Sequence, residues 1–503
     1  MSSNHEQTLQ QYQEMMQKMR SYEDALGVLY WDLRTGAPRK GIDVRAETIG
    51  TLSTELFRIG TSEQLGELLD RLLEPGIYAD LPRMMQRSLE EMKKEYDRSK
   101  KIPEELYKRY VTLASQSEAA WEEAKPANDF AKFRPYLEQI VEFKKQFIDY
   151  WGFVDNKYDT LLDMYEPGMT VAKLDPIFRT LREQLVPLVA DITAQRPRDF
   201  SYMKRTVPLD KQKALNTFLL GEMGFDFAAG RIDESAHPFA TGLNPGDVRV
   251  TTRYLPDDLL YSLFSTMHEG GHALYEQQIS KDLIGTNLCT GTSMGIHESQ
   301  SRLWENMIGR SRFFWERYYP DLQRYIPEFA DISLDAFYMG INEVKASFIR
   351  TESDELTYNL HIIIRYELEK ELINGQLQVA DLPSAWNEKY REYLGIVPPT
   401  DTLGVLQDVH WSDGGFGYFP SYSLGNMYAA QMMDAMKRAM PAFDDHVRQG
   451  QLAPINDWLR EHIYQHGRLL TPSEIIERIA GGPLDPSYFI QYLQQKFKRL
   501  YAL

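Results

Sequence analysis

The sequence contains very little cysteine, with one residue, Cys289, in 503. A single thiol excludes an intramolecular disulfide, which is typical of proteins from a reducing compartment. The N-terminal stretch MSSNHEQTLQQYQEMMQKMR is polar and lacks the apolar core of a signal peptide. No run of about 18 apolar residues occurs that would span a membrane. We therefore expect a cytoplasmic protein without a transmembrane segment.

Positively charged residues are fewer than negatively charged ones. Lys and Arg number 56 against 73 Asp and Glu, which gives a net charge of −17. This balance argues against a nucleic-acid surface and against binding to anionic membranes. Repeats, low-complexity tracts and linker-like segments are absent. With 43% apolar residues, an ordinary globular composition, residues 1–503 are predicted to form one large domain with two lobes.

Most of the chain has the apolar spacing of amphipathic helices, for example from Gln7 to Leu29. The segment Gly246–Tyr254 differs, because β-branched and aromatic residues alternate with charged ones, a period typical of a strand. The Gly- and Thr-rich segment Ile284–Gly295 is the predicted pairing partner of this strand. The fold class is therefore predicted to be mostly α, with a small β-sheet.

A histidine pair lies between these two segments, in DDLLYSLFSTMHEGGHALYEQQ (257–278). Asp257 is the predicted N-cap of a helix that carries His268 and His272 one turn apart on the same face. Two imidazoles so placed can bind one metal ion, and Glu269 would lie beside that ion, where it can accept a proton from water. This H-E-x-x-H pattern is typical of zinc hydrolases. The alternative is a chance pair on a purely structural helix.

The two glycines inside this helix argue against that alternative. Gly270 and Gly271 each cost about 1 kcal/mol of helix stability relative to alanine. A purely structural helix has no evident need for them. We expect them where the substrate backbone or another element approaches the helix closely.

A catalytic zinc ion needs a third protein ligand and one open position. The candidates downstream are Glu276, His297 and Glu298. Glu276 follows His272 by four residues on the same helix, which would require awkward geometry for a third bond. His297 and Glu298 point about 100° apart on a helix, so only one of them is expected to bind. The residue pattern alone does not choose between them.

Several further motifs follow one another along the chain: HPF (237–239), DVRVT (247–251), HEGGH (268–272), HESQSR (297–302), IRTESDELTY (349–358) and GVLQDVHW (404–411). In this order they resemble the carboxypeptidase Taq family of zinc metallocarboxypeptidases. The N-terminal stretch LYWDLRTGAPRKGIDVRAETIGTLSTELF is similar to the opening of that family, with Ala37 where Met is common. Ser353 replaces the usual Ala in the fifth motif. The resemblance covers nearly the whole chain.

This resemblance implies a two-lobed helical molecule with a deep groove, similar to neurolysin and the angiotensin-converting enzymes. The zinc-binding catalytic segment would span about 237–425, with Glu298 as the third ligand beside His268 and His272. Cobalt is an alternative metal. The implied activity is removal of single C-terminal residues from peptides, with broad specificity and poor action on C-terminal proline. Homodimers are usual in the family.

The family pattern also suggests roles for residues outside the metal centre. Arg350 would bind the terminal carboxylate of the substrate, with Arg249 and Arg253 as alternative anchors. The simpler interpretation of Arg350 is an i,i+4 ion pair with Asp354 on a solvated helix that also carries Tyr358. Further roles are implied for His410 and Tyr422 as donors to the oxyanion, Tyr418 as a contact of the substrate terminus, and His237 as a cap on one end of the groove. The alternative for His410 is a core histidine satisfied by Asp408, and the alternative for the two tyrosines is packing.

Two other functions remain open from the sequence. A related zinc oligoendopeptidase or dipeptidyl carboxypeptidase would share the metal chemistry but hold the substrate elsewhere. A catalytically silent helical peptide-binding protein would contain the histidine pair by chance. Asp354 and Asp408 are candidate hydrogen-bond partners of the two histidines.

Overall fold

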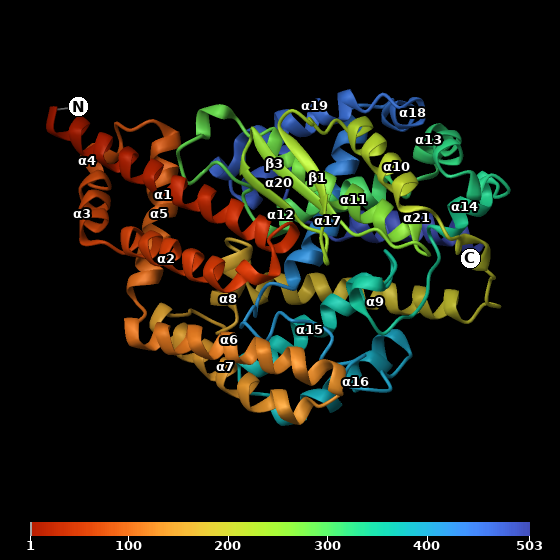
Figure 1. The fold of residues 1–503 in the computed structure, drawn as a ribbon, viewed down its shortest axis with the longest axis horizontal. Coiled ribbons are helices and arrows are strands. Elements are labelled where there is room, and N and C mark those ends of the chain that lie inside the picture. The colour runs from red at the N-terminus through yellow and green to blue at the C-terminus, as the bar shows by residue number, and fades with distance from the viewer. Residues whose placement is uncertain (1–2) are drawn as a thin grey trace.

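The computed structural model describes residues 3–503, and its elements are mainly helices (Figure 1). The helices before the sheet are α1 (Ser3–Thr35), α2 (Ile42–Gly60), α3 (Glu63–Leu72), α4 (Pro75–Tyr78), α5 (Arg83–Lys100), α6 (Glu104–Ala127), α7 (Phe130–Trp151), α8 (Asp159–Tyr165), α9 (Val171–Thr193) and α10 (Leu209–Glu222). Those after it are α11 (Leu259–Gln277), α12 (Met294–Arg302), α13 (Arg312–Tyr325), α14 (Leu334–Gly340), α15 (Tyr358–Ile373), α16 (Leu382–Leu394), α17 (Pro420–Ala439), α18 (Phe443–Gln449), α19 (Ala453–His462), α20 (Pro472–Ala480) and α21 (Ser487–Tyr501). The predicted fold class, mostly α with a small sheet, is confirmed.

The sheet has three strands in the order β1-β3-β2: β1 (Gly230–Glu234), β2 (Ala240–Asn244) and β3 (Asp247–Thr252). The central β3 is the strand predicted from alternation, and it pairs parallel with β1 and antiparallel with β2. The predicted pairing of β3 with 284–295 is wrong, because both neighbours of β3 in the sheet, β1 and β2, come before β3 in the sequence. The segment 284–295 instead joins α11 to α12.

Helix α11 packs against the inner face of this sheet, where Val248 and Val250 of β3 are fully buried. Asp258 is the N-cap of α11 and accepts a hydrogen bond from the backbone N–H of Tyr261 at 3.0 Å. The predicted cap, Asp257, is wrong by one residue; its carboxylate accepts from Thr206 instead. On its other side α11 contacts α12, which in turn packs against α17.

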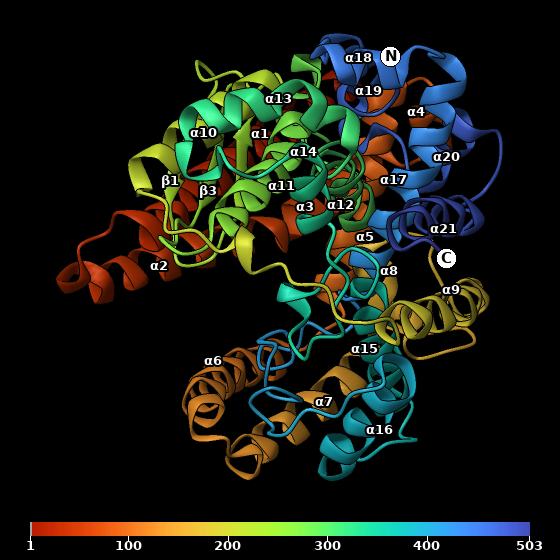
Figure 2. The same ribbon diagram turned by 90° about the vertical axis from the view of Figure 1, so that its right-hand side faces the viewer.

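The apolar interior is divided between two clusters. The larger one spans Leu113 to Tyr501 and includes the buried side chains of α11, α12 and α17. A separate, smaller cluster joins α1, α3, α4 and α5 through buried residues such as Tyr12, Leu69 and Leu89. In Figures 1 and 2, α6, α7, α15 and α16 lie together, apart from the sheet and α10–α14. Within residues 3–503, no helix combines the length and apolar character needed to cross a bilayer.

Candidate metal centre and active site

Helix α11 presents His268 and His272 toward Glu298 of α12. The Nε2 atoms of the two histidines lie 3.5 and 3.3 Å from Oε2 of Glu298, and one ligand atom from each residue falls within 4.8 Å of the others. A tetrahedral ion about 2.0–2.1 Å from each ligand separates its ligands by roughly 3.3–3.4 Å. The three side chains therefore fit a divalent metal ion with two nitrogen donors and one oxygen donor.

Glycines make the close packing of these helices possible. A Cβ atom on Gly271 would lie 2.5 Å from the carbonyl oxygen of Gln300 and 2.6 Å from Cα of Ser301, both in the backbone of α12. A Cβ atom on Gly425 of α17 would lie 2.5 Å from Cγ of Glu298. The expectation that another element approaches the histidine helix closely is confirmed. That element is the helix that carries Glu298.

An arginine and a serine of the same helix hold the Glu298 carboxylate. Nε of Arg302 donates to Oε1 of Glu298 at 2.6 Å, and Oγ of Ser301 donates to Oε2 at 3.0 Å. Burial opposes the ionisation of Glu298, but Arg302 and both histidines outweigh it and hold the pKa below the ordinary value of a glutamate. Glu298 is therefore a carboxylate, as a metal ligand must be.

A π-helical turn, Leu303–Ile308, continues α12 and places Glu305 behind His268. Oε2 of Glu305 lies 2.8 Å from Nδ1 of His268. A carboxylate on Nδ1 favours the tautomer whose Nε2 is free to bind metal, an arrangement common around metal-bound histidines. Such π-turns are rare and frequent at functional sites. Sequence reasoning missed Glu305, although its spacing of seven from Glu298 predicts the same helix face.

The second histidine has a different partner. Nδ1 of His272 lies 2.6 Å from Nδ1 of His297, whose Nε2 lies 2.8 Å from Oε1 of Glu276. Of the three candidates for the third ligand, Glu298 is the one that lies in the metal-competent group with His268 and His272, whereas His297 and Glu276 lie next to His272. The suggestion that Asp354 or Asp408 holds the histidines is wrong, because these carboxylates bind other groups.

Glu269 is buried beside the two histidines and, within residues 3–503, its carboxylate makes no hydrogen bond or ion pair. Burial raises the pKa of Glu269 to about 7, with a smaller opposing effect from His268. A carboxyl group with a pKa near neutrality can both take up and release a proton, which is the requirement for a general base that later acts as an acid.

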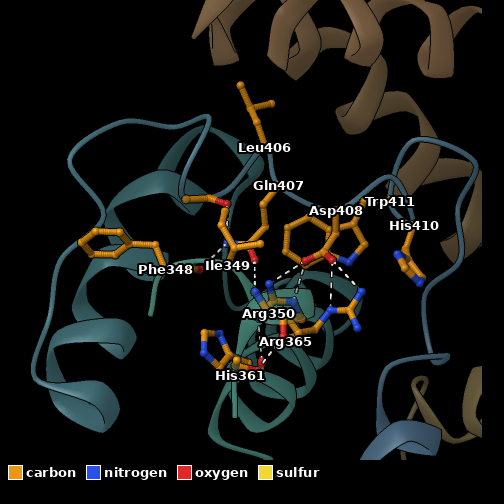
Figure 3. A network of polar contacts seen from close by, with 12 residues as sticks. Phe348, Ile349, Arg350, His361, Arg365, Leu406, Gln407, Asp408, His410 and Trp411 are labelled. Carbon is orange, nitrogen blue, oxygen red and sulfur yellow. Dashed lines mark hydrogen bonds and ion pairs between the residues drawn. The ribbon is translucent and has the colours of Figure 1, made fainter. Parts of the chain in front are cut away.

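Arg350 belongs to a buried ion network on another part of the site (Figure 3). Nε and NH2 of Arg350 bind Oδ1 of Asp408 at 3.1 and 3.0 Å, and Arg365 binds Oδ2 at 2.6–2.7 Å. Burial opposes the ionisation of Asp408, but Arg365 and Arg350 hold its pKa below the ordinary range. The proposed ion pair between Arg350 and Asp354 is wrong, because Arg350 lies in a short turn, 350–352, before α15 begins.

His410 and Tyr422, the two oxyanion donors implied by the family resemblance, lie together. Nε2 of His410 is 3.3 Å from the Tyr422 hydroxyl, whereas Nδ1 is buried without a partner among the described residues. Burial lowers the pKa of His410 to about 4, so the ring is neutral near pH 7. The ring of Tyr418 lies 5.2 Å from that of Tyr422, and the Arg350 guanidinium lies 4.9 Å from the Tyr422 ring. The network therefore connects Arg350 to all three residues.

Tyr422 also lies close to the metal ligands. It precedes Gly425 by three residues on α17, so both face the same side of that helix. Gly425 packs directly against the Glu298 side chain. The charge of Glu298 contributes to the raised pKa of both Tyr418 and Tyr422, although burial is the larger cause. The metal centre and the His410 group therefore form one site.

Two buried glutamates support this site from behind. Glu166, just after α8, accepts from the backbone N–H of Gly295 at the start of α12 and from the Tyr428 hydroxyl. Glu369 of α15 accepts from Trp411 Nε1 at 2.7 Å and from the Gly417 N–H at 2.8 Å, at the two ends of the segment after His410. Burial raises the pKa of each glutamate to about 7.

Arg249 and His237 lie in the region of the sheet. The Arg249 guanidinium forms a two-point pair with Asp247 at 2.8 Å and covers the Trp31 ring at 4.6 Å. His237 is exposed between β1 and β2. Arg253, just beyond β3, is exposed and has no ion pair among the described residues. Neither Arg249 nor His237 contacts the metal ligands in the described part of the chain.

Comparison with known proteins agrees with this geometry. The Carboxypeptidase Taq (M32) metallopeptidase family matches residues 11–497. The chain belongs to this family. It is 51% identical to carboxypeptidase 1 of Bacillus subtilis (strain 168) over 492 residues, covering 97% of this chain and 98% of that protein. Thermostable carboxypeptidase 1 of Thermus thermophilus is 39% identical over 505 residues, covering 98% and 99%.

Solved structures give the same result for the fold. The M32 carboxypeptidase from Deinococcus radiodurans R1 superposes with a TM-score of 0.95 at 37% identity, covering 99% of this chain and 100% of that one. Metallocarboxypeptidase 1 of Trypanosoma cruzi superposes with a TM-score of 0.93 at 34% identity, covering 98% and 99%. The protein is therefore a metallocarboxypeptidase of the carboxypeptidase Taq family, with peptides as substrates.

Proposed function

We propose that the protein is a zinc-dependent carboxypeptidase that removes one residue at a time from the C-terminus of peptides. The observation that carries this proposal is the convergence of His268, His272 and Glu298 beside the unpaired, buried Glu269. Two imidazoles and one carboxylate are a donor set typical of catalytic zinc. We propose broad side-chain specificity with poor action on C-terminal proline, and cobalt as a substitute for zinc.

A divalent ion held by these three residues would supply Lewis acidity toward a water molecule and the scissile carbonyl group. Glu269 takes the proton from the attacking water and returns it to the leaving amine. His410, neutral near pH 7, and the Tyr422 hydroxyl donate hydrogen bonds to the developing oxyanion. The remaining members of the site bind the substrate.

We assign the terminal carboxylate of the substrate to Arg350. Two arginines share the single Asp408 carboxylate, so their network carries an excess positive charge in a buried place. A guanidinium has five N–H donors, and Arg350 uses three of them, two on Asp408 and one on the Tyr358 hydroxyl. Two donors are left for a carboxylate. Tyr418 contacts the same end of the substrate, and Arg249 and Arg253 are the alternative anchors.

The larger arrangement completes the proposal. We propose a catalytic segment of about 237–425 within one domain of two lobes. A deep groove similar to those of neurolysin and the angiotensin-converting enzymes would lie between the lobes, with His237 as a cap at one end of it. On the family resemblance we propose a homodimer, and on the single cysteine and polar N-terminal sequence we propose a cytoplasmic location. The size of the purified protein in light scattering tests the dimer independently of activity.

Digestion of an unmodified peptide followed by mass spectrometry tests the reaction. We expect a ladder of single-residue losses from the C-terminus. Amidation of that terminus should slow cleavage strongly, and Arg350→Gln should raise KM for the free acid more than for the amide. Internal cuts or loss of dipeptides would identify an endopeptidase or a dipeptidyl carboxypeptidase instead.

Glu269→Gln tests the chemistry separately. This variant keeps the size of the side chain and the three metal ligands but loses the base, so we expect zinc to remain bound while activity falls to background. Activity at the level of the unaltered enzyme would mean that Glu269 is not the base.

A further inference from the structure

The two histidines of the metal centre are supported by unequal hydrogen-bond partners. His268 faces a carboxylate directly, because Oε2 of Glu305 lies 2.8 Å from its Nδ1. His272 reaches a carboxylate only through a second imidazole, that of His297, which lies between it and Glu276. The three residues of this hydrogen-bond chain are largely buried. Their side-chain exposures are 18% for His272, 23% for His297 and 10% for Glu276.

The geometry fixes the position of each proton in the chain once His272 binds an ion. Nε2 of His272 faces Oε2 of Glu298 at 3.3 Å, so it must carry a free electron pair and the proton of the ring must lie on Nδ1. Nδ1 of His297 lies 2.6 Å away and therefore has to accept. The proton of His297 is then on Nε2, 2.8 Å from Oε1 of Glu276.

Glu276 completes the hydrogen-bond chain because its Oε1 accepts from Nε2 of His297. Its Oε1 also accepts from the backbone N–H of Gly291 at 3.1 Å, which holds the carboxylate in place. Glu276 follows His272 by four residues on α11, and His297 precedes Glu298 on α12. The series of hydrogen bonds therefore runs from His272 on α11 to His297 on α12 and back to Glu276 on α11. It therefore links the two helices that carry the ligands.

A competing arrangement of protons shows what this chain would accomplish. If Nδ1 of His297 carried a proton, it would donate to Nδ1 of His272. The His272 proton would then lie on Nε2 and point at Glu298, so that this nitrogen could not bind a metal ion. We propose that Glu276, acting through His297, is a positioning residue that holds His272 in the tautomer with a free Nε2. This inference rests on the proposed function, because it takes His272 to be a metal ligand.

Zinc affinity of the purified protein, measured by competition with a chelator, tests this relay of His272, His297 and Glu276 without reference to activity. We expect Glu276→Leu and His297→Leu each to weaken zinc binding on the order of 10–100-fold, the usual effect of a lost partner of a metal-bound histidine. Glu276→Gln should have a smaller effect, because the amide oxygen can still accept from His297. The double variant Glu276→Leu/His297→Leu should bind zinc no more weakly than His297→Leu alone.

Glu305→Gln serves as the comparison on the other histidine. Its effect should add to that of Glu276→Leu, since the two act on different ligands. Zinc affinity of Glu276→Leu within twofold of the unaltered protein would overturn the relay, as would losses from Glu276→Leu and His297→Leu that simply add. If the unaltered protein binds no zinc, the proposed function itself fails, and the relay with it.

Nitrogen-15 spectra of histidine-labelled protein give an independent result, which holds even if the leucine variants do not fold. In the zinc-loaded protein we expect His297 to carry its proton on Nε2 and to have a bare Nδ1. The same spectrum is expected for Glu276→Gln. A proton on Nδ1 of His297 in the zinc-loaded protein would overturn the proposal.

Discussion

Two sides of the active site are held in place by different physical means. The helix side consists of α11 and α12 with His268, Glu269, His272 and Glu298, and it is fixed by backbone packing at glycines that tolerate almost no added volume. The loop side consists of 404–422 with Arg350, and it is fixed by a buried carboxylate shared between two arginines. Close backbone packing at glycines therefore positions the candidate metal ligands in addition to their ion pairs, whereas the loop residues depend mainly on one shared carboxylate.

Asp408→Asn should have the largest effect and should act on the loop side alone. It leaves Arg350 and Arg365 buried without their carboxylate, and breaking a buried pair in this way costs about 3–5 kcal/mol of the free energy of unfolding. Urea denaturation measures this loss. Asp444→Asn, which removes an exposed pair with Lys437, is the control and should cost less than about 1 kcal/mol. Equal losses in the two variants, or a matching loss of zinc affinity in Asp408→Asn, would contradict the division into two sides.

Tyr422→Phe should impair catalysis while leaving zinc affinity unchanged. Loss of one donor to the oxyanion lowers kcat on the order of 10²–10³-fold, and the ring itself remains to pack against His410. Steady-state kinetics on one peptide measures this effect. Tyr418→Phe is the matched variant and should raise KM more than it lowers kcat. An unchanged kcat in Tyr422→Phe would remove that residue from the reaction.

The buried glutamates behind the two sides should make stability depend on pH. Glu166 supports the helix side and Glu369 the loop side, and burial raises each pKa from 4.5 to about 7. The folded protein therefore binds more protons than the unfolded chain between about pH 4.5 and 7, so stability falls as pH rises through that range. The cost reaches up to about 3 kcal/mol per glutamate above pH 7.

Glu166→Gln and Glu369→Gln isolate this effect. Each glutamine variant lacks the titrating carboxyl group. Its free energy of unfolding relative to that of the unaltered protein should therefore rise by up to about 3 kcal/mol between pH 5 and pH 8. Urea midpoints at the two pH values measure the change. A stability difference that stays constant across this range would show that the carboxyl group does not titrate there.

Gly271→Ala should have a smaller effect on stability than Asp408→Asn but a specific effect on metal binding. The added methyl group meets the backbone of α12, and overpacking of this kind costs about 1–3 kcal/mol. Because α12 carries Glu298, separating the helices also moves the third ligand and should weaken zinc binding. Gly50→Ala in α2 is the control, since its methyl group meets nothing within 4 Å and should stabilise the helix slightly. Unchanged zinc affinity in Gly271→Ala would mean that α12 shifts without moving its carboxylate.

The sequence predicted the helix side better than the loop side, and the reason is the range of the interactions. The pattern around His268 and His272 is local, so a helix with both ligands on one face follows from spacing alone. The strand β3 pairs with β2 across the short turn at 245–246 and with β1 from further back in the chain, and both partners show little alternation, with Gly230 and Gly242 among their residues. The choice of Glu298 as the third ligand needed the family resemblance.

The loop side was predicted only as a set of residue types. The spacing of Arg350, Asp354 and Tyr358 suggested one helix face, but the Asp354 carboxylate accepts from the backbone N–H groups of Leu356 and Thr357. This local bonding competes with helix formation and delays the start of α15 until Tyr358. Arg350 is therefore free to reach Asp408, a partner 58 residues away that no local pattern identifies.

The small apolar cluster of α1, α3, α4 and α5 has its own consequence. Its interior is separate from the larger apolar cluster, and it is joined to the rest of the chain by polar contacts such as Arg20 to the Leu243 carbonyl and Ser88 to Asn287. We therefore expect these helices to open as a unit, breaking those contacts, before the larger cluster opens. We expect a protease acting under mildly destabilising conditions to cut first in the N-terminal hundred residues and to leave a resistant C-terminal fragment that contains the candidate metal ligands.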